Sequence, residues 1–178
     1  MTILRFFCFT LVALCLPQGT RADMLPQIDI RKEGSAWRVR VEATFSAPAR
    51  QIWSVLTDCG RATAFVPHLE SCRVMDHDPN GRWDIRENVS NPPLLPRMRT
   101  LVRSDYQAPR HFTYKLVSGD MKRSEGSWTL MPQPGGTQVV YVALIEPSLP
   151  APGFLVANAI KADLPDMFRK LEALTRAP

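Results

Sequence analysis

The sequence predicts an α+β domain in which an antiparallel sheet packs against one long C-terminal helix. Apolar and polar residues alternate in several segments between Trp37 and Leu144, and period two is typical of half-buried strands. The last segment changes to three- and four-residue spacing, the period of an amphipathic helix. Runs of strands followed by a helix indicate the α+β class.

Residues 1–22 predict a secretory signal peptide. Arg5 precedes the apolar run "FFCFTLVALCL", and the small residue Ala22 is placed for cleavage. The run is too short to span a bilayer comfortably. A buried N-terminal helix and a lipoprotein anchor at Cys15 are the alternatives. We therefore expect an exported, periplasmic protein whose mature domain is residues 23–178.

The charge of the mature chain is modest. Cleavage after Ala22 removes Arg5 and Arg21, so 22 Lys and Arg against 17 Asp and Glu become 20 against 17, a net charge of +3. This excess is too weak for a nucleic-acid partner, and no dense Lys/Arg run is present. The 178 residues, 45% of them hydrophobic, suffice for one soluble domain with its own core. We expect a monomer.

Two strands and two short helices are expected first. A short strand around Ile28–Arg31 is expected to pair with the alternating segment Trp37–Ser46 across "KEGSA". "SAPARQIWSVLTD" then has helical spacing, with Pro48 suited to the first turn. A second short helix is expected over Arg61–Val66, stopping before Pro67.

The middle of the chain alternates again. "CRVMDHD" and "RWDIRENV" flank "DPNG", whose Asn80-Gly81 is a strong hairpin signal. "RMRTLVRSDY" and "HFTYKLV" follow, and a last hairpin, "EGSWTLMPQPGGTQVVYVALIEP", turns at Pro134-Gly135-Gly136. We expect about seven strands in total.

Residues from about Pro152 to Arg176 predict the long helix. Pro165 lies inside it and is expected to kink it. A long amphipathic helix against a strongly twisted sheet can leave a cavity between the two. Its apolar positions are Val156, Ile160, Leu164, Met167, Phe168, Leu171 and Leu174.

This order of elements resembles the START-like (SRPBCC) superfamily, and most closely its polyketide cyclase/dehydrase and coenzyme Q-binding branch. The resemblance rests on "VEATFSAPARQIWSVLTDC", "FVPHLESCRV", "GDMKRSEGSWTL" and "LPAPGFLVANAIKADLPDMFRKL", and it covers nearly all of the mature chain. It implies the helix-grip fold, a strongly twisted sheet wrapped around the last helix, with a deep apolar cavity. The superfamily includes binders, transporters and enzymes, so it does not fix the function.

The residues expected to line or close that cavity come from the sheet and the last helix. Packing in a solid core is the alternative for each of them, because aromatic and Met side chains are common core fillers. The sheet residues are Trp83, Met98, Tyr106, Phe112 and Tyr114, and the helix residues are Phe154, Ile160, Leu164, Met167 and Phe168.

Two apolar loops are expected to gate the cavity. "SNPPLLPR" holds Leu94 and Leu95 between prolines, and "PSLPAPGF" leads into the last helix. Exposed apolar loop tips are costly unless something covers them. They fit a gate over a hydrophobic ligand, or tips that contact a membrane surface beside Arg97, Arg99 and Arg103. Packing against each other or against a second copy is the remaining alternative.

Cys59 and Cys72 are expected to form a disulfide, because an even pair in an exported chain is most often bonded. Free thiols are the alternative. A bond closing this short loop contributes up to about 3 kcal/mol. We expect no metal, since His68 alone is too small a ligand set.

Catalytic motifs are not found, and we expect neither a catalytic residue nor a cofactor. The three histidines are scattered, and no nucleophile elbow or zinc-binding helix is present. Asp163 and Asp166 beside Pro165 are candidates for tuned acids, whereas Arg86 and Glu87 are interpreted as a solvated rim.

The sequence therefore favours a module that binds a hydrophobic small molecule or lipid without catalysis. A polyketide cyclase or dehydratase is the first alternative, and a buried acid or His facing the cavity would favour it. A protein-interaction module in the envelope is the second, because both faces of the last strand are apolar. Val140, Val142 and Leu144 form one face and Val139, Tyr141 and Ala143 the other.

Overall fold

A computed structural model describes residues 25–93, 95–148 and 152–176. The predicted signal peptide and Leu94 lie outside these residues. The described strands form one antiparallel sheet in the order β1-β2-β8-β7-β6-β5-β4-β3. The strands are β1 (Gln27–Glu33), β2 (Ala36–Phe45), β3 (Leu69–His77), β4 (Trp83–Ser90), β5 (Met98–Gln107), β6 (His111–Gly119), β7 (Met121–Gln133) and β8 (Gly136–Pro147). The helices are α1 (Ala49–Leu56), α2 (Cys59–Phe65) and α3 (Gly153–Arg176).

The predicted α+β helix-grip architecture is confirmed, but the sheet has eight strands rather than about seven. The N-terminal segment is a full strand, because β1 pairs with β2 along its whole length, from Gln27 opposite Glu42 to Glu33 opposite Ala36. The Asn80-Gly81 turn joins β3 to β4 as expected, with Gly81 at a φ of 68° that favours glycine.

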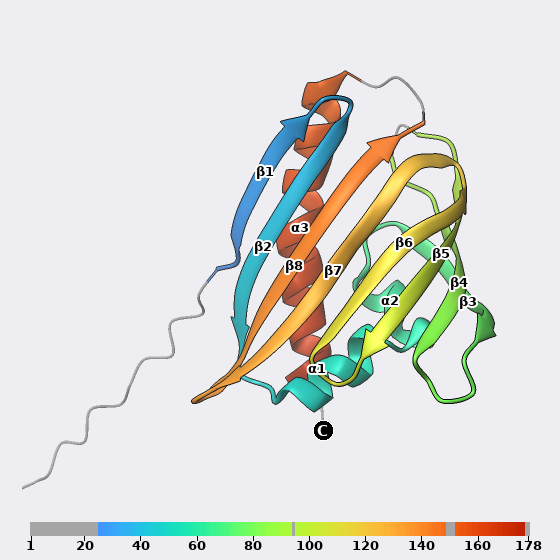
Figure 1. Ribbon diagram of the computed structural model, residues 1–178. Helices are drawn as coiled ribbons and strands as arrows, with labels where there is room; N and C mark the ends of the chain where they lie inside the picture. Colours follow the sequence, from blue (N-terminus) through green and yellow to red (C-terminus); the bar gives the residue numbers. More distant parts are fainter. Residues whose placement is uncertain (1–24, 94, 149–151, 177–178) are drawn as a thin grey trace, which may run out of the picture.

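Helix α3 lies across one face of the sheet (Figure 1). It runs from Gly153 through Pro165 to Arg176. Helices α1 and α2 lie at the end of the sheet where α3 finishes, which we call the helix end. The opposite end, called the loop end, carries the β1–β2 turn, the β4–β5 loop and the start of α3 (Figure 1).

The residue just before each short helix determines where that helix begins. Pro48 occupies the position just before α1. Helix α2 begins at Cys59 rather than at the predicted Arg61, because the Asp58 carboxylate accepts a hydrogen bond from the Gly60 N–H at 2.8 Å. Cys59 is joined by a disulfide to Cys72 on β3, with Cα atoms 5.4 Å apart. The bond fixes the start of α2 to a strand at the edge of the sheet.

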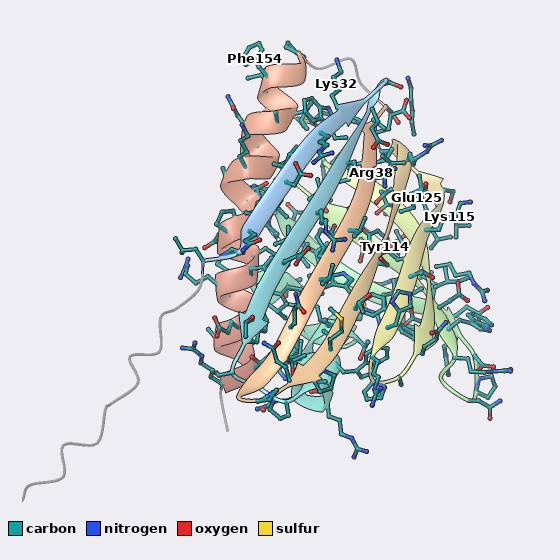
Figure 2. The ribbon with its side chains drawn as sticks, turned by 60° about the vertical axis from the view of Figure 1, so that its left-hand side comes forward. Lys32, Arg38, Tyr114, Lys115, Glu125 and Phe154 are labelled. Atoms are coloured by element: carbon teal, nitrogen blue, oxygen red, sulfur yellow. A yellow bond between two sulfur atoms is a disulfide. The ribbon has the colours of Figure 1, made fainter. Side chains whose placement is uncertain are left out.

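The outer face of β8 is covered by its neighbours. Leu144 stands between Arg38 on β2 and Glu125 on β7. Figure 2 shows Arg38, Glu125 and Lys115 at one level across β2, β7 and β6. The alkyl stems of such long side chains cover apolar neighbours while their charges stay in water. Leu144 is only partly exposed, so the apolar outer face does not form a bare patch.

Candidate functional site

The inner face of the sheet is filled with aromatic rings toward the helix end. The rings of Phe112 and Trp128 stack at 6.4 Å between centroids, and Trp128 stacks on Phe168 of α3 at 5.6 Å. Trp53 of α1 meets the edge of Phe112 at 5.7 Å. Phe112, Trp128 and Phe168 are all buried. This half of the interior is a packed core.

The inner face toward the loop end is different, because its apolar side chains remain half-exposed. Tyr141 and Ile145 on β8, Leu116 on β6 and Ile160 on α3 face inward yet are not fully buried. A pocket of about 160 Å³ opens beside Tyr141, Ile145 and Ile160. We call it the inner pocket, and it is lined by Val39, Pro67, Tyr141, Ile145, Ile160, Asp163, Leu164 and Met167.

A pair of tyrosines supplies the hydrogen-bonding groups beside the apolar wall of the inner pocket. The hydroxyl of Tyr114 on β6 lies 2.9 Å from the hydroxyl of Tyr141 on β8. Burial raises the pKa of both phenols above the ordinary value. Both side chains are therefore uncharged across the physiological range, and each retains its O–H proton.

Gly126 on β7 makes this pairing possible. It lies opposite Tyr114 in the β6–β7 ladder and opposite Ala143 in the β7–β8 ladder. A Cβ atom at Gly126 would come within 2.8 Å of the Tyr114 hydroxyl and would also meet the carbonyl oxygen of Val142. The absence of a side chain lets the Tyr114 ring cross β7 and reach Tyr141. The glycine in "EGSW" thus shapes the site.

A polar contact lies beside the opening of the inner pocket. Pro67, which lines the pocket, precedes His68 in the α2–β3 connection. His68 has a φ of 58°, an uncommon backbone conformation for a residue other than glycine. Its Nε2 lies 3.2 Å from Oδ1 of Asp163 on α3. The contact fastens the connection to the helix beside the opening.

A second polar cluster is buried between β4, β5 and the end of α1. The Arg86 guanidinium contacts the Asp84 carboxylate at 2.7 Å, and the Tyr106 hydroxyl donates to the same carboxylate at 2.9 Å. Arg86 also donates to the carbonyl of Thr57, just after α1. Both charged side chains are only 11% exposed. Arg86 is therefore not a solvated rim residue as interpreted from the sequence. It fastens α1 to the inner face of the sheet.

A family model described as polyketide cyclase / dehydrase and lipid transport matches residues 45–172 of this sequence. The chain belongs to that family. The match runs from the end of β2 to the last turns of α3 and so includes every wall of the inner pocket except Val39. No curated protein shows significant similarity to the sequence.

Solved structures of this family's fold resemble the chain over most of its length. A STAR-related lipid transfer protein from Xanthomonas axonopodis has a TM-score of 0.71 at 17% identity, covering 88% of this chain and 97% of that one. A START superfamily protein from Mycobacterium smegmatis has a TM-score of 0.68 at 20% identity, covering 78% and 97%. The ZhuI aromatase/cyclase from Streptomyces sp. R1128 has a TM-score of 0.64 at 17% identity, covering 79% and 94%. These likenesses show the fold.

Among the residues expected to line the family's cavity, three on α3 do line the inner pocket, namely Ile160, Leu164 and Met167. Tyr114 adjoins it through its bond to Tyr141. Tyr106, Phe112 and Phe168 instead pack in the aromatic core.

Trp83 was expected to line the cavity, but it lies on the outer face of the sheet. The neighbouring Asp84 points inward to Tyr106, and successive residues of a strand face opposite sides. The guanidinium carbon of Arg103 lies 4.5 Å from the centre of the Trp83 ring. This cation–π contact is an outer-face contact far from the inner pocket.

The described residues of the two expected gate loops lie close together at the loop end, whereas residues 149–151 of the second loop lie outside the described residues. Leu95, Pro96, Arg97 and Met98 share a pocket of about 380 Å³ with Gly119, Asp120, Pro147 and Ser148. Leu95 is 37% exposed, and Phe154 at the start of α3 is 65% exposed. Figure 2 shows Phe154 near Lys32 at the end of β1. Leu94 lies outside the described residues.

A larger groove of about 500 Å³ lies on another flank of α3, beside the start of β1 and the end of β2. Charged side chains of α3 contribute to its wall, including Asp166, Arg169 and Glu172. Asp166 is paired with Arg169 and Lys170. We place the site in the inner pocket instead, because the half-exposed apolar face of the sheet lies there.

Sequence reasoning missed Tyr141, Asp84 and Arg86. Tyr141 shares a strand face with Val139 and Ala143, both fully buried, and that alternation is a usable signal for an inward residue. No comparable signal marks an inward arginine. In the described segments no group of three or more His, Cys, Asp or Glu is arranged to hold a metal ion. None of the described helices is long and apolar enough to cross a membrane.

Proposed function

We propose that this protein is an exported START-like module that binds a hydrophobic small molecule or lipid in the inner pocket and does not transform it. The observation that carries the proposal is the half-exposed apolar face at the loop end, next to a packed core at the helix end. Leaving apolar side chains partly in water costs free energy, on the order of 25 cal/mol per Å². A bound apolar molecule would cover them and recover that energy.

The family assignment supports the kind of ligand, since the family's description includes lipid transport. The structurally similar Xanthomonas axonopodis protein is named as a STAR-related lipid transfer protein. A gate at the loop end is part of this proposal, and it is supported by Leu95 and Pro147, which come from the two expected gate loops and line one pocket. The His68–Asp163 contact holds the α2–β3 connection beside the opening of the inner pocket.

The test uses a matched pair of tryptophan variants on α3. Ile160→Trp fills the inner pocket, whereas Ala159→Trp places the same side chain on the exposed side of the helix. Protein refolded free of ligand is exposed to a lipid extract and analysed by native mass spectrometry. We expect bound small molecules on the wild type and on Ala159→Trp but not on Ile160→Trp. Equal retention of bound molecules by both variants would show that the binding site is not the inner pocket.

Export is the second part of the proposal. The basic start, short apolar run and small-residue exit of residues 1–22 support it. The Cys59–Cys72 disulfide also suits an oxidising compartment such as the periplasm. Fusion of residues 1–22 to a reporter that is active only after export tests this, and an inactive fusion argues for a cytoplasmic protein.

Contact with a membrane surface during ligand loading is the third part. Leu95, Phe154 and Leu155 are exposed apolar side chains at the loop end, and Lys32 adds a positive charge there. We expect the monomer to sediment with anionic phospholipid vesicles, and a Phe154→Ser/Leu155→Ser variant to sediment less. Unchanged sedimentation of that variant excludes this end as the contact.

An enzymatic function of the cyclase or dehydratase type is the second candidate, and one observation favours it. Asp163 lines the inner pocket and contacts the imidazole of His68, and an imidazole is a group that can exchange a proton with a bound molecule. Incubation with a poly-β-keto thioester tests this. Turnover that His68→Asn abolishes would establish catalysis, and no turnover by the wild type would favour binding alone.

A further inference from the structure

The inner pocket has one uncharged hydrogen-bonding group in a wall that is otherwise mostly apolar. Val39, Ile145, Ile160, Leu164 and Met167 present only carbon and sulfur side-chain atoms. Tyr141 lines the pocket from the sheet side, and its hydroxyl lies 2.9 Å from the hydroxyl of Tyr114. A polar group placed in such a wall orients a ligand and selects it.

The tyrosine pair has one O–H donor that the contact between the two hydroxyls does not use. Two phenols carry two O–H protons, and the 2.9 Å contact between the Tyr114 and Tyr141 hydroxyls uses one of them. The other proton is available to an acceptor that enters the pocket. Because burial raises the pKa of both phenols, neither gives up its proton at neutral pH.

The charges around the pocket argue against an anionic ligand. Neither lysine nor arginine is among the lining residues in the described part of the chain, and the one charged side chain there is the carboxylate of Asp163. Arg86 lies outside the inner pocket and is engaged with Asp84, Tyr106 and the Thr57 carbonyl. An ionised group moved into this wall would lose its hydration and gain no opposite charge.

We propose that the inner pocket selects an uncharged ligand with a ketone, ester or alcohol oxygen at its buried end, which accepts a hydrogen bond from the Tyr114–Tyr141 pair. This inference rests on the proposed binding function and specifies the ligand's chemistry. The pocket volume of about 160 Å³ fits a ring at that end, since an apolar cavity of about 150 Å³ holds benzene.

Three small probes of nearly equal shape test the proposal. Acetophenone offers a neutral carbonyl oxygen. Cumene has a methyl group in place of that oxygen, and benzoate has a charged carboxylate in place of the acetyl group. Each is titrated into the full mature protein at neutral pH, and the amide and methyl chemical shifts around Ile145, Ile160 and Leu164 report binding at the inner pocket. We expect acetophenone to bind most tightly, cumene more weakly and benzoate not measurably.

Tyr141→Phe and Tyr114→Phe keep both rings and remove one hydroxyl each. A hydrogen bond contributes about 1 kcal/mol, so we expect Tyr141→Phe, which removes the hydroxyl of the residue that lines the pocket, to weaken acetophenone binding about fivefold and to leave cumene binding unchanged. Tyr114→Phe leaves the Tyr141 proton free for the ligand, so we expect it to keep the carbonyl preference. Far-ultraviolet circular dichroism and the shifts of distant amides verify that each variant is folded. A carbonyl preference lost in Tyr141→Phe and kept in Tyr114→Phe supports the proposal, and one that Tyr141→Phe keeps contradicts it.

Two results would overturn it in distinguishable ways. If acetophenone and cumene bind equally to the wild type, or if benzoate binds as tightly as acetophenone, the pocket binds ligands but does not select by this hydroxyl pair. The binding function then stands without the proposed chemistry. If none of the probes shifts the inner-pocket resonances, both the selectivity and the binding function proposed for this pocket fail.

Discussion

Replacement of Arg86 by leucine is predicted to destabilise the fold strongly, although the residue lies outside the inner pocket. Arg86 pairs with Asp84 at 2.7 Å, and both side chains are 11% exposed. It also donates to the Tyr106 hydroxyl at 2.7 Å and to the Thr57 carbonyl. Leucine removes all of these donors at once and leaves the carboxylate of Asp84 buried without an opposite charge.

The expected magnitude follows from that isolated carboxylate. Removing one partner of a buried ion pair typically costs about 3–5 kcal/mol, because the remaining charge keeps its desolvation penalty and loses its compensation. The Asp84→Leu/Arg86→Leu double variant removes both charges. We expect it to recover most of the loss, since apolar replacement of a whole buried pair is often close to neutral.

Urea unfolding followed by circular dichroism measures these changes. The neighbouring strand offers a matched control, because Arg103 and Asp105 are also two residues apart and form an ion pair on the outer face. Leucine at Arg103 is expected to change the unfolding midpoint little, since exposed pairs contribute little. If Arg86→Leu shifts the midpoint no more than Arg103→Leu does, the Arg86 cluster does not fasten α1 to the sheet.

Three further predictions concern the disulfide, the tyrosines and the glycine of β7. Cys59→Ser/Cys72→Ser is expected to lose about 3 kcal/mol of the free energy of unfolding, and reductant should then have no further effect; an unchanged urea midpoint contradicts this. All three tyrosines have a raised pKa through burial, so above the unfolded pKa of about 10 the unfolded chain binds fewer protons and stability falls as pH rises. Phenolate absorbance should therefore appear together with unfolding, and its reversible appearance in folded protein would refute the assignment. Gly126→Ala should cost about 1–3 kcal/mol by overpacking against Tyr114 and the Val142 carbonyl, whereas an unchanged melting temperature would show that the site has room.

Much of the fold could be predicted because the chain's alternation is regular. Val39, Val41 and Phe45 lie on one face of β2 because even numbers of residues separate them. All three are buried against α3 and α1. The hairpin turn at Asn80-Gly81 fixes the register of β3 and β4 in the same local way. The sheet has one strand more than the expected seven or so, and β1 at its edge buries few of its side chains, so its apolar pattern is weak.

The faces of β4 could not be predicted by hydrophobicity. A rule that turns apolar residues inward places Trp83 in the cavity and Arg86 in solvent, and the structure shows the reverse. Arg86 can face inward because Asp84 on the same strand, the Thr57 carbonyl and the Tyr106 hydroxyl satisfy its donors. The contacts with Thr57 and Tyr106 depend on tertiary distances that the local sequence does not contain.

The site itself was predictable in part for the same reason. The apolar stripe of α3 correctly supplied Ile160, Leu164 and Met167 as pocket residues. Which part of the interior is packed and which is open depends on how the aromatic rings of Phe112, Trp128 and Phe168 stack. That packing is a property of the assembled sheet and helices.

The most direct test of the central claim is to locate a bound apolar molecule by intermolecular nuclear Overhauser effects. Ligand-free protein is loaded with cumene, and its contacts with the methyl groups of the protein are recorded. The claim predicts contacts with Ile145, Ile160 and Leu164, which line the inner pocket. Contacts confined to Phe154 and Leu155 on the exposed start of α3, or to the groove at Ala162 and Ala173, would contradict it.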